Sequence, residues 1–181
     1  MNHQIAAIVV IALMATGCER APVPIEKVMP PPPVKPAKAR ELVLSPVAIG
    51  PVTFGTRLAH IEASLGQAIR LDQSDNPECS FVSFKALPKV RFMVEKGMIT
   101  RADVEPDIAN TSGIRVGDTE ALLKEKHPTV KVERHEYAPG GHVFTIAGDG
   151  KGALLFESDA GKITSVRAGL QPAVSYSEGC A

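Results

Sequence analysis

A proline-rich segment at residues 21–40 limits what the rest of this chain can fold into. Seven of the 15 prolines lie in this segment, and its apolar residues follow no helical or strand period. Proline fixes φ and removes a backbone donor, so such a segment favours extended polyproline II over a helix or a sheet. The folded part therefore begins near Glu41. It holds about 140 of the 181 residues, which is enough for one domain with its own core.

The segment before the prolines has the organisation of a cleaved leader. An apolar run covers residues 5–14, and the small residues Ala15 and Gly17 come shortly before Cys18. This arrangement resembles the lipobox of bacterial lipoproteins. The resemblance implies cleavage before Cys18 and a lipid on its sulfur, so we expect residues 1–17 to be a signal peptide.

A membrane-spanning helix is the alternative for the apolar run, and its length argues against it. The run ends after about a dozen residues, before the polar pair Glu19 and Arg20, whereas a membrane span needs about 20 residues. A Cys18 that carries two or more acyl chains is itself a stable anchor. Residues 18–40 are then a lipidated tether. By analogy, Glu19 directs the protein to the outer membrane facing the periplasm, with the cell surface as the other orientation.

The charge of the folded part argues against nucleic acid as a partner. The chain has 20 basic and 20 acidic residues, and the first 40 residues hold five of the basic and two of the acidic ones, which leaves 15 and 18. A phosphate-binding surface needs a net positive footprint, and this balance is negative. The chain also has no tryptophan and only two tyrosines. An aromatic platform for sugars is therefore not expected.

Two cysteines remain once Cys18 is assigned to the lipid. In a compartment that oxidises thiols, Cys79 and Cys180 are expected to form one disulfide. The bond would attach the end of the chain to the middle of the domain. Two buried free thiols are the alternative.

Residue periodicity predicts both helices and strands in the folded part. Residues 56–65 and 118–127 are expected helices, with Thr56 and Asp118 as N-caps. Turns that contain glycine at 95–98 and 159–161 occupy similar positions. Alternating apolar and polar residues indicate strands at 90–94, 99–104, 143–147, 153–157 and 163–167.

The order of these segments predicts the fold class. We expect an α+β domain over 41–181 that consists of two tandem helix-plus-antiparallel-strand repeats, about 41–108 and 109–181. A single repeat would leave one sheet face bare and would have little core. The two repeats are therefore expected to pack side by side as one domain.

The glycine spacing of the first repeat resembles that of a known family. Gly55, Ile61, Leu65 and Gly66 are spaced as in the small outer-membrane lipoprotein A family, which includes the BamE component of the barrel-assembly machine. Two tandem copies are similar to the architecture of the β-lactamase-inhibitor proteins. The resemblance covers about 40–180. It implies a non-enzymatic protein that binds another protein through a sheet face or loops.

A polar cluster at residues 135–142 is the candidate partner-binding site. Pro139 and Gly140 predict a tight turn, which would hold His135, Tyr137 and His142 near one loop tip. Zinc ligation by the two imidazoles and a neighbouring carboxylate is one alternative, and an ordinary hairpin with a packed tyrosine is the other. The spacing of the histidines is not a recognised zinc pattern, so no metal is expected.

The sequence contains no motif that predicts catalysis or a cofactor. Lys151 lies among the glycines of 148–152, but Gly152 follows it where a phosphate loop has Ser or Thr, and the segment lies between predicted strands. No nucleophile motif of the Gly-x-Ser-x-Gly type is present. His60 and His127 are expected to be surface residues on helices.

These observations predict a non-enzymatic envelope lipoprotein. We expect it to bind another envelope protein in the periplasm, in outer-membrane assembly or maintenance, and to contact the membrane through the lipid on Cys18. An inhibitor or immunity protein against an envelope-targeted hydrolase is the alternative within protein binding. A hydrolase with an unrecognised site and a structural spacer are the alternatives from other classes.

Overall fold

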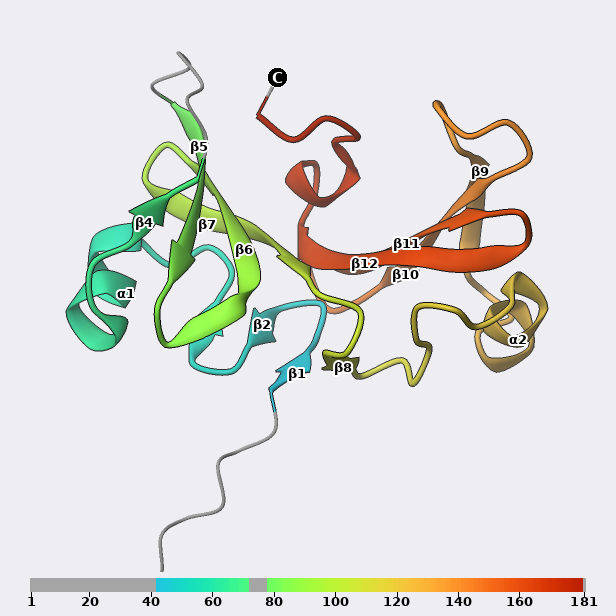
Figure 1. Ribbon diagram of the computed structural model, residues 1–181, viewed down its shortest axis with the longest axis horizontal. Coiled ribbons are helices and arrows are strands. Elements are labelled where there is room, and N and C mark those ends of the chain that lie inside the picture. Colours follow the sequence, from blue (N-terminus) through green and yellow to red (C-terminus); the bar gives the residue numbers. More distant parts are fainter. Residues whose placement is uncertain (1–41, 72–77, 181) are drawn as a thin grey trace, which may run out of the picture. The chain divides into compact units, whose positions relative to one another are not determined.

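The computed structural model describes residues 42–71 and 78–180 (Figure 1). Most of the regular structure in these ranges is β-sheet. Eight strands form one antiparallel sheet in the order β4-β5-β6-β7-β12-β11-β10-β9. In that order the strands are Ile69–Arg70, Cys79–Phe84, Leu87–Glu95, Met98–Val104, Lys162–Leu170, Gly152–Asp159, His142–Ala147 and Lys131–Arg134.

The centre of this sheet joins strands that are far apart in the sequence. β7 pairs with β12, with Arg101 opposite Gly169 and Asp103 opposite Arg167. A Cβ atom at Gly169 would lie 2.4 Å from the Thr100 carbonyl oxygen and 2.7 Å from the Arg101 Cα. A residue without a side chain is therefore needed for β12 to lie this close to β7. This junction makes the eight strands continuous.

A second, smaller sheet has the order β3-β2-β1-β8. β1 pairs antiparallel with β2 and parallel with β8. Leu44, Ile49 and Val52 of this sheet are completely buried, so the small sheet contributes to the core. Its strands are β1 Val43–Leu44, β2 Ala48–Ile49, β3 Val52–Thr53 and β8 Ala109–Asn110.

Two short α-helices precede the two groups of long strands. α1 is Leu58–Leu65 and α2 is Glu120–Lys126. The predicted N-caps are wrong by one residue, because the caps are Arg57, which makes no side-chain cap bond, and Thr119, whose hydroxyl accepts from the Leu122 N–H. Each helix has one buried residue, Ile61 or Leu123, which anchors it to the core.

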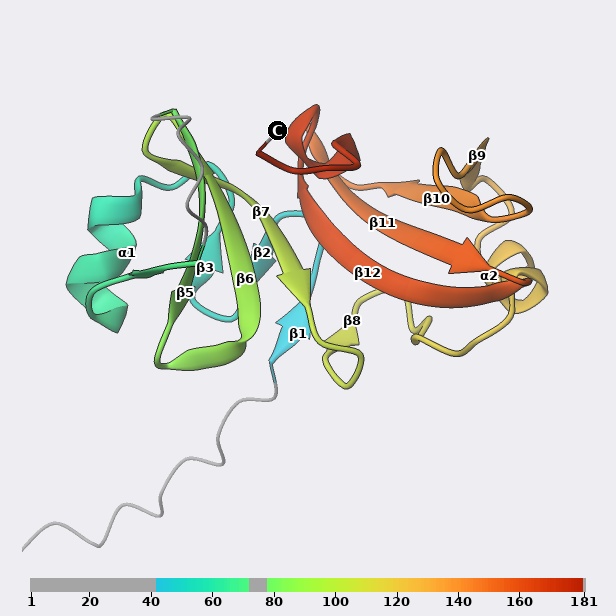
Figure 2. The same cartoon turned by 45° about the horizontal axis from the view of Figure 1, so that its top comes forward.

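The two faces of the eight-stranded sheet are covered differently. One face packs on the helices and the small sheet in a core that includes Phe92, Phe144 and Phe156. The C-terminal segment, which we define as residues 171–180 and which includes the 3₁₀ turn Ala173–Ser175, lies on the other side of β12 from β1 and β8 (Figure 1). Figure 2 shows this segment beside the start of β11 and the end of β12. We call the sheet face on which the C-terminal segment lies the open face.

The predicted α+β fold of two tandem helix-plus-strand repeats is wrong. Strand residues far outnumber helix residues in the described ranges, and the strands belong to two sheets of four and eight strands. The long strands of the two predicted repeats belong to one eight-stranded sheet, because β7 and β12 join edge to edge. Edge-to-edge pairing satisfies backbone donors and acceptors that two separate sheets would expose. The helices, of eight and seven residues, are minor elements.

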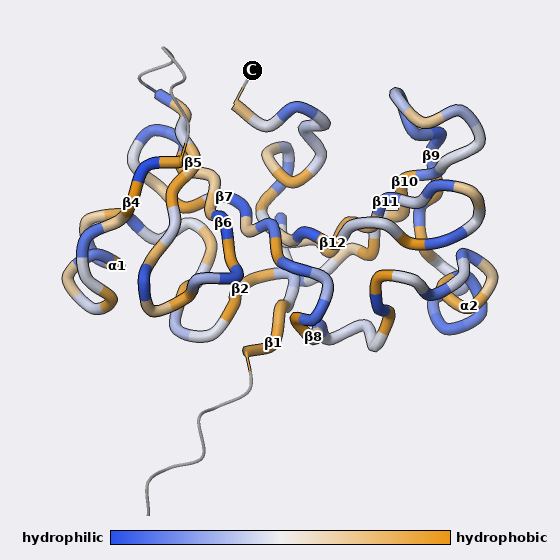
Figure 3. Tube along the Cα trace, viewed as in Figure 1, coloured by the Kyte–Doolittle hydropathy of each residue, from blue (hydrophilic) through white to orange (hydrophobic). Residues whose placement is uncertain are grey.

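The edges of the long sheet are short or charged. β4 has two residues, and β9 consists of four exposed residues, three of them charged. Figure 3 shows the hydrophilic character of β9. Short and charged edges discourage pairing with a further strand.

The predicted signal peptide and tether, residues 1–40, lie outside the described residues. Within 42–71 and 78–180, neither helix has the length and apolar character that a membrane crossing requires.

Candidate functional site

The C-terminal segment is fixed across the open face by two buried arginines and a disulfide. Arg101 on β7 donates from Nη1 to the Tyr176 carbonyl oxygen at 2.7 Å, and Arg167 on β12 donates from Nε to the Val174 carbonyl oxygen at 2.8 Å. The predicted disulfide is present and joins Cys180 to Cys79 on β5. The segment is thus attached to three strands of the sheet, which gives it a defined position.

Small apolar contacts lie beneath the segment. Ala173 packs in a buried cluster with Cys79, Phe81 and Met93. The neighbouring Val174 is completely buried and packs on Ala153 and Leu155 of β11. These contacts exclude water from the arginine-to-carbonyl bonds, which strengthens them.

Glu157 on β11 balances the charge of Arg167. The Arg167 Nη1 forms an ion pair with Glu157, and the Ser165 hydroxyl donates to the same carboxylate at 2.8 Å. Burial raises the pKa of Glu157, but the charge of Arg167 and these hydrogen bonds outweigh burial and lower it below its ordinary value. The His135 Nε2 lies 3.9 Å from the Glu157 carboxylate. The open face therefore contains an ion pair, Arg167 with Glu157, in which the two charges neutralise each other.

The predicted turn at the tip of the 135–142 loop is confirmed. The Gly141 N–H donates to the Ala138 carbonyl oxygen at 2.9 Å, and Gly140 has φ of 84°. Pro139 and Gly140 thus occupy the two central positions of the turn, where a proline and a residue with positive φ are favoured. The sequence signal for this turn was sufficient because it depends on adjacent residues only.

The side chains of the loop do not converge on one point. The His135 Nδ1 accepts hydrogen bonds from the Tyr137 and Ala138 N–H groups, both at 3.1 Å, so this imidazole organises the loop itself. The His142 Nδ1 instead lies 2.9 Å from Glu120 of α2. Pro139, Gly140 and Tyr137 remain exposed. The three exposed residues are available to a partner, and the two imidazoles are occupied within the domain.

Glu120, His142 and Ser158 contain the residue types of a hydrolytic triad but not its geometry. The Ser158 hydroxyl donates to Glu120 at 2.6 Å, and the imidazole also contacts Glu120 and not the hydroxyl. Ser158 is 1% exposed. A serine nucleophile needs a base on its hydroxyl and access to substrate. This cluster therefore attaches α2 to β10 and β11.

The described residues do not form a site with the geometry of metal ligation. Within 42–71 and 78–180, no group of three or more His, Cys, Asp and Glu side chains is arranged to hold a metal ion. In the 135–142 loop the reason is visible, because His135 and His142 contact different carboxylates.

Two exposed residues of the loop, Glu136 and Tyr137, contact the C-terminal segment. Tyr137, which is 58% exposed, donates its hydroxyl to Glu178 at 2.6 Å, and the Ser177 hydroxyl donates to Glu136 at 3.2 Å. The bond to Glu178 raises the pKa of the Tyr137 phenol. These contacts flank a cavity of about 500 Å³. We call it the tyrosine pocket, and its lining residues are Glu136, Tyr137, Tyr176, Ser177, Glu178 and Gly179.

The tyrosine pocket contains both tyrosines of the chain. Sequence reasoning identified Tyr137 but missed Tyr176 and Glu178, although it predicted the disulfide of Cys180. That disulfide was the available signal, because it fixes the last residues of the chain on the sheet. It did not indicate that the segment would also reach the loop at Tyr137.

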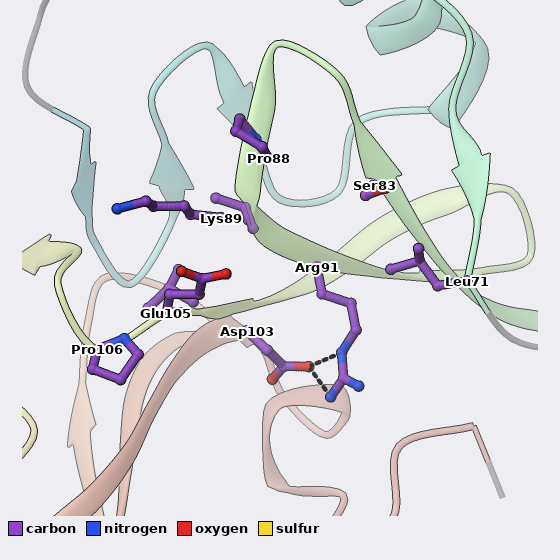
Figure 4. Close-up of a pocket in the computed structure, with 10 residues that line it drawn as sticks. Leu71, Ser83, Pro88, Lys89, Arg91, Asp103, Glu105 and Pro106 are labelled. Carbon is purple, nitrogen blue, oxygen red and sulfur yellow. Dashed lines mark hydrogen bonds and ion pairs between the residues drawn. The ribbon is translucent and has the colours of Figure 1, made fainter.

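A second cavity lies on the other half of the open face (Figure 4). It has a volume of about 420 Å³, and its basic side chains are already paired. Arg91 donates to Asp103 at 3.1 Å, and Lys89 forms an ion pair with Asp107. Figure 4 shows the Arg91 guanidinium directed at the Asp103 carboxylate. The basic side chains of this cavity are therefore not free to bind an anionic ligand.

Comparisons with known proteins do not extend this description. No protein-family model matches the sequence, and comparisons with characterised proteins and with solved structures give no significant match.

We predict that the protein loses stability in acid through Glu157. Because its folded-state pKa is depressed, this carboxylate stabilises the fold above its unfolded pKa of about 4.3, and that contribution is lost as the pH falls through the folded pKa. Urea unfolding at pH 6 and at pH 3 measures the effect. Glu157→Gln should reduce the difference between the free energies of unfolding at pH 6 and at pH 3. An unchanged difference would contradict the assignment of this effect to Glu157.

Proposed function

We propose that this protein is a lipid-anchored, non-enzymatic envelope protein that binds another protein through the tyrosine pocket. The observation that carries the proposal is that both tyrosines of the chain, 58% and 38% exposed, line one surface cavity. Tyrosine is enriched at interface positions that contribute most to affinity. In a chain without tryptophan, this surface holds the aromatic groups best suited to a partner.

Preorganisation of the pocket supports the same proposal. One wall of the pocket is the 135–142 loop, which is ordered by the hydrogen bond from the Tyr137 N–H to the His135 side chain. The other wall is the C-terminal segment, which Arg101 and the disulfide of Cys180 attach to the sheet. A binding surface that is already ordered loses less conformational entropy on association. The hydrogen bond between Tyr137 and Glu178 connects the two walls.

The anchor and the location are parts of the same proposal. The lipobox-like residues before Cys18 support a lipid anchor, and Glu19 supports the outer membrane facing the periplasm. The resemblance to the BamE family supports a role in outer-membrane assembly or maintenance.

An inhibitor or immunity protein against an envelope hydrolase is the second candidate. It is favoured by Glu136 and Tyr137, an acidic and an aromatic side chain next to each other at an exposed loop tip. Such a pair is suited to enter an enzyme cleft. The identity of the protein recovered with this chain separates the two candidates.

Tyr137→Ala tests the proposed interface. We expect the substitution to weaken partner binding by more than about 1 kcal/mol, because the few interface residues that contribute most to affinity, among which tyrosine is enriched, exceed that cost. The melting temperature should stay nearly unchanged, because the side chain is largely exposed. Cross-linking in intact envelopes followed by recovery of the chain measures binding.

Ile69→Ala is the matched control for Tyr137→Ala. Ile69 is 54% exposed but lies on β4, at the opposite end of the sheet. Recovery should be normal in this variant. Lower stability of Tyr137→Ala, by several kcal/mol, would mean that the loop is structural, and equal recovery from both variants would contradict the interface.

Intact mass of the envelope protein tests the anchor. We expect the mature chain to begin at Cys18 with a lipid on its sulfur, and Cys18→Ser to leave an uncleaved precursor without lipid. A wild-type mass that still includes residues 1–17 would contradict the proposed processing.

A further inference from the structure

We infer that the tyrosine pocket binds a basic side chain, an arginine or a lysine, of the partner protein. The inference rests on the proposed function and adds the chemistry of the contact. It follows from the carboxylates and aromatic rings that line one cavity.

The two carboxylates of the pocket have no cation of their own. Glu136 accepts from the Ser177 hydroxyl and Glu178 accepts from the Tyr137 hydroxyl, and both donors are neutral. Among the described residues, neither carboxylate takes part in an ion pair. The pocket thus presents two negative charges that no side chain of the described part of the chain neutralises.

Two other carboxylates of this domain, Glu157 and Asp103, face arginines, in contrast to Glu136 and Glu178. Glu157 forms an ion pair with Arg167 beneath the C-terminal segment. Asp103 forms an ion pair with Arg91 in the cavity of Figure 4 and a second one with the buried Arg101. Arg134, at the end of β9, shares a neighbouring cavity with Glu136, but it forms no ion pair with Glu136 and does not line the tyrosine pocket. Charge complementarity therefore favours a cation from outside the domain.

The aromatic rings favour the same kind of ligand. Tyr137 and Tyr176 line the cavity with exposed rings, and the face of a tyrosine ring attracts a cation. Glu136 and Glu178 line the same cavity as the two rings, so a guanidinium or an ammonium group bound there is close to negative charge as well. The volume of about 500 Å³ accommodates a single long side chain.

Tyrosine fluorescence is a direct probe of this pocket. The chain has two tyrosines and no tryptophan, and both tyrosines line the cavity. The full-length lipidated chain in a non-ionic detergent is titrated with N-acetyl-arginine amide. The comparison ligand is N-acetyl-citrulline amide, which has a similar shape and no charge.

We expect saturable binding of the arginine derivative in about the millimolar range and no saturation with the citrulline derivative. The double variant Glu136→Gln/Glu178→Gln should weaken binding by about tenfold, because charge-assisted contacts are lost. Glutamine keeps an acceptor for Tyr137 and Ser177. The matched control is Glu105→Gln, which removes an exposed carboxylate from the other cavity and should leave binding unchanged.

Equal responses to the two ligands would overturn the inference, and so would an equal effect of Glu105→Gln and the double variant. The proposed function is tested separately by Tyr137→Ala. If recovery of a partner depends on Tyr137 but the arginine derivative does not bind, the inferred contact with a basic side chain is refuted. The proposed protein-binding function is not affected by that outcome. Binding of the arginine derivative without any partner that depends on Tyr137 refutes the proposed function.

Discussion

Removal of the disulfide by the double substitution Cys79→Ala/Cys180→Ala is expected to lower the free energy of unfolding by about 3–5 kcal/mol. The two cysteines are 101 residues apart, and a cross-link that closes a loop of this length restricts the unfolded chain strongly. The bond also positions the C-terminal segment on β5. Its loss should therefore change the tyrosine fluorescence, because Tyr176 and the bond from Tyr137 to Glu178 depend on that segment.

Urea unfolding with and without dithiothreitol checks this expectation. Reduction should destabilise the wild-type protein by a similar amount and should have no effect on the double variant, which controls for the substitutions themselves. A loss below about 1 kcal/mol, or a double variant that still responds to the reductant, would contradict a stabilising disulfide between these two cysteines.

Local patterns were sufficient to locate five of the long strands, whereas β5, Cys79–Phe84, was not predicted. The predicted strands at 90–94 and 99–104 fall within β6 and β7, and those at 143–147, 153–157 and 163–167 fall within β10, β11 and β12. Turns depend on adjacent residues and alternation has a period of two, so both are visible in a short window of sequence. The same is true of the turn at Pro139 and Gly140.

The pairing of β7 with β12 was not predictable in this way, and the fold prediction failed because of it. Nothing near Thr100 or Gly169 in the sequence indicates that the two strands meet. Glycine in a strand suggests a close approach of another backbone, but it does not identify which one. The expectation of two tandem helix-plus-strand repeats packed side by side therefore gave the wrong architecture.

The position of the candidate site was only partly predictable for a related reason. Arg101 and Arg167 occur in alternating strands, where a basic residue normally indicates a face in water. They are 4% and 6% exposed because carbonyl groups of Tyr176 and Val174 cover them. A contact between a strand and a chain terminus leaves no periodic signal, so one wall of the tyrosine pocket could not be anticipated.

Arg167→Met is expected to destabilise the protein by about 3 kcal/mol, because it leaves the partly buried Glu157 without its countercharge. The Val174 carbonyl oxygen also loses its donor. Methionine keeps much of the apolar stem of the arginine, so the loss reports mainly on charge and hydrogen bonding. Urea unfolding at neutral pH measures it.

The pH dependence of this variant distinguishes an unpaired buried charge from a packing defect. In the wild-type protein Glu157 has a lowered pKa, so its contribution to stability is lost as the pH falls. Without Arg167, burial raises its pKa, and acidification should then restore part of the lost stability by neutralising it. Glu157→Gln added to Arg167→Met should recover stability at neutral pH for the same reason.

The control Arg91→Met removes a half-exposed arginine that pairs with Asp103 and should cost less than about 1 kcal/mol. An equal cost for the two arginines would mean that Arg167 does not act as the buried countercharge beneath the C-terminal segment.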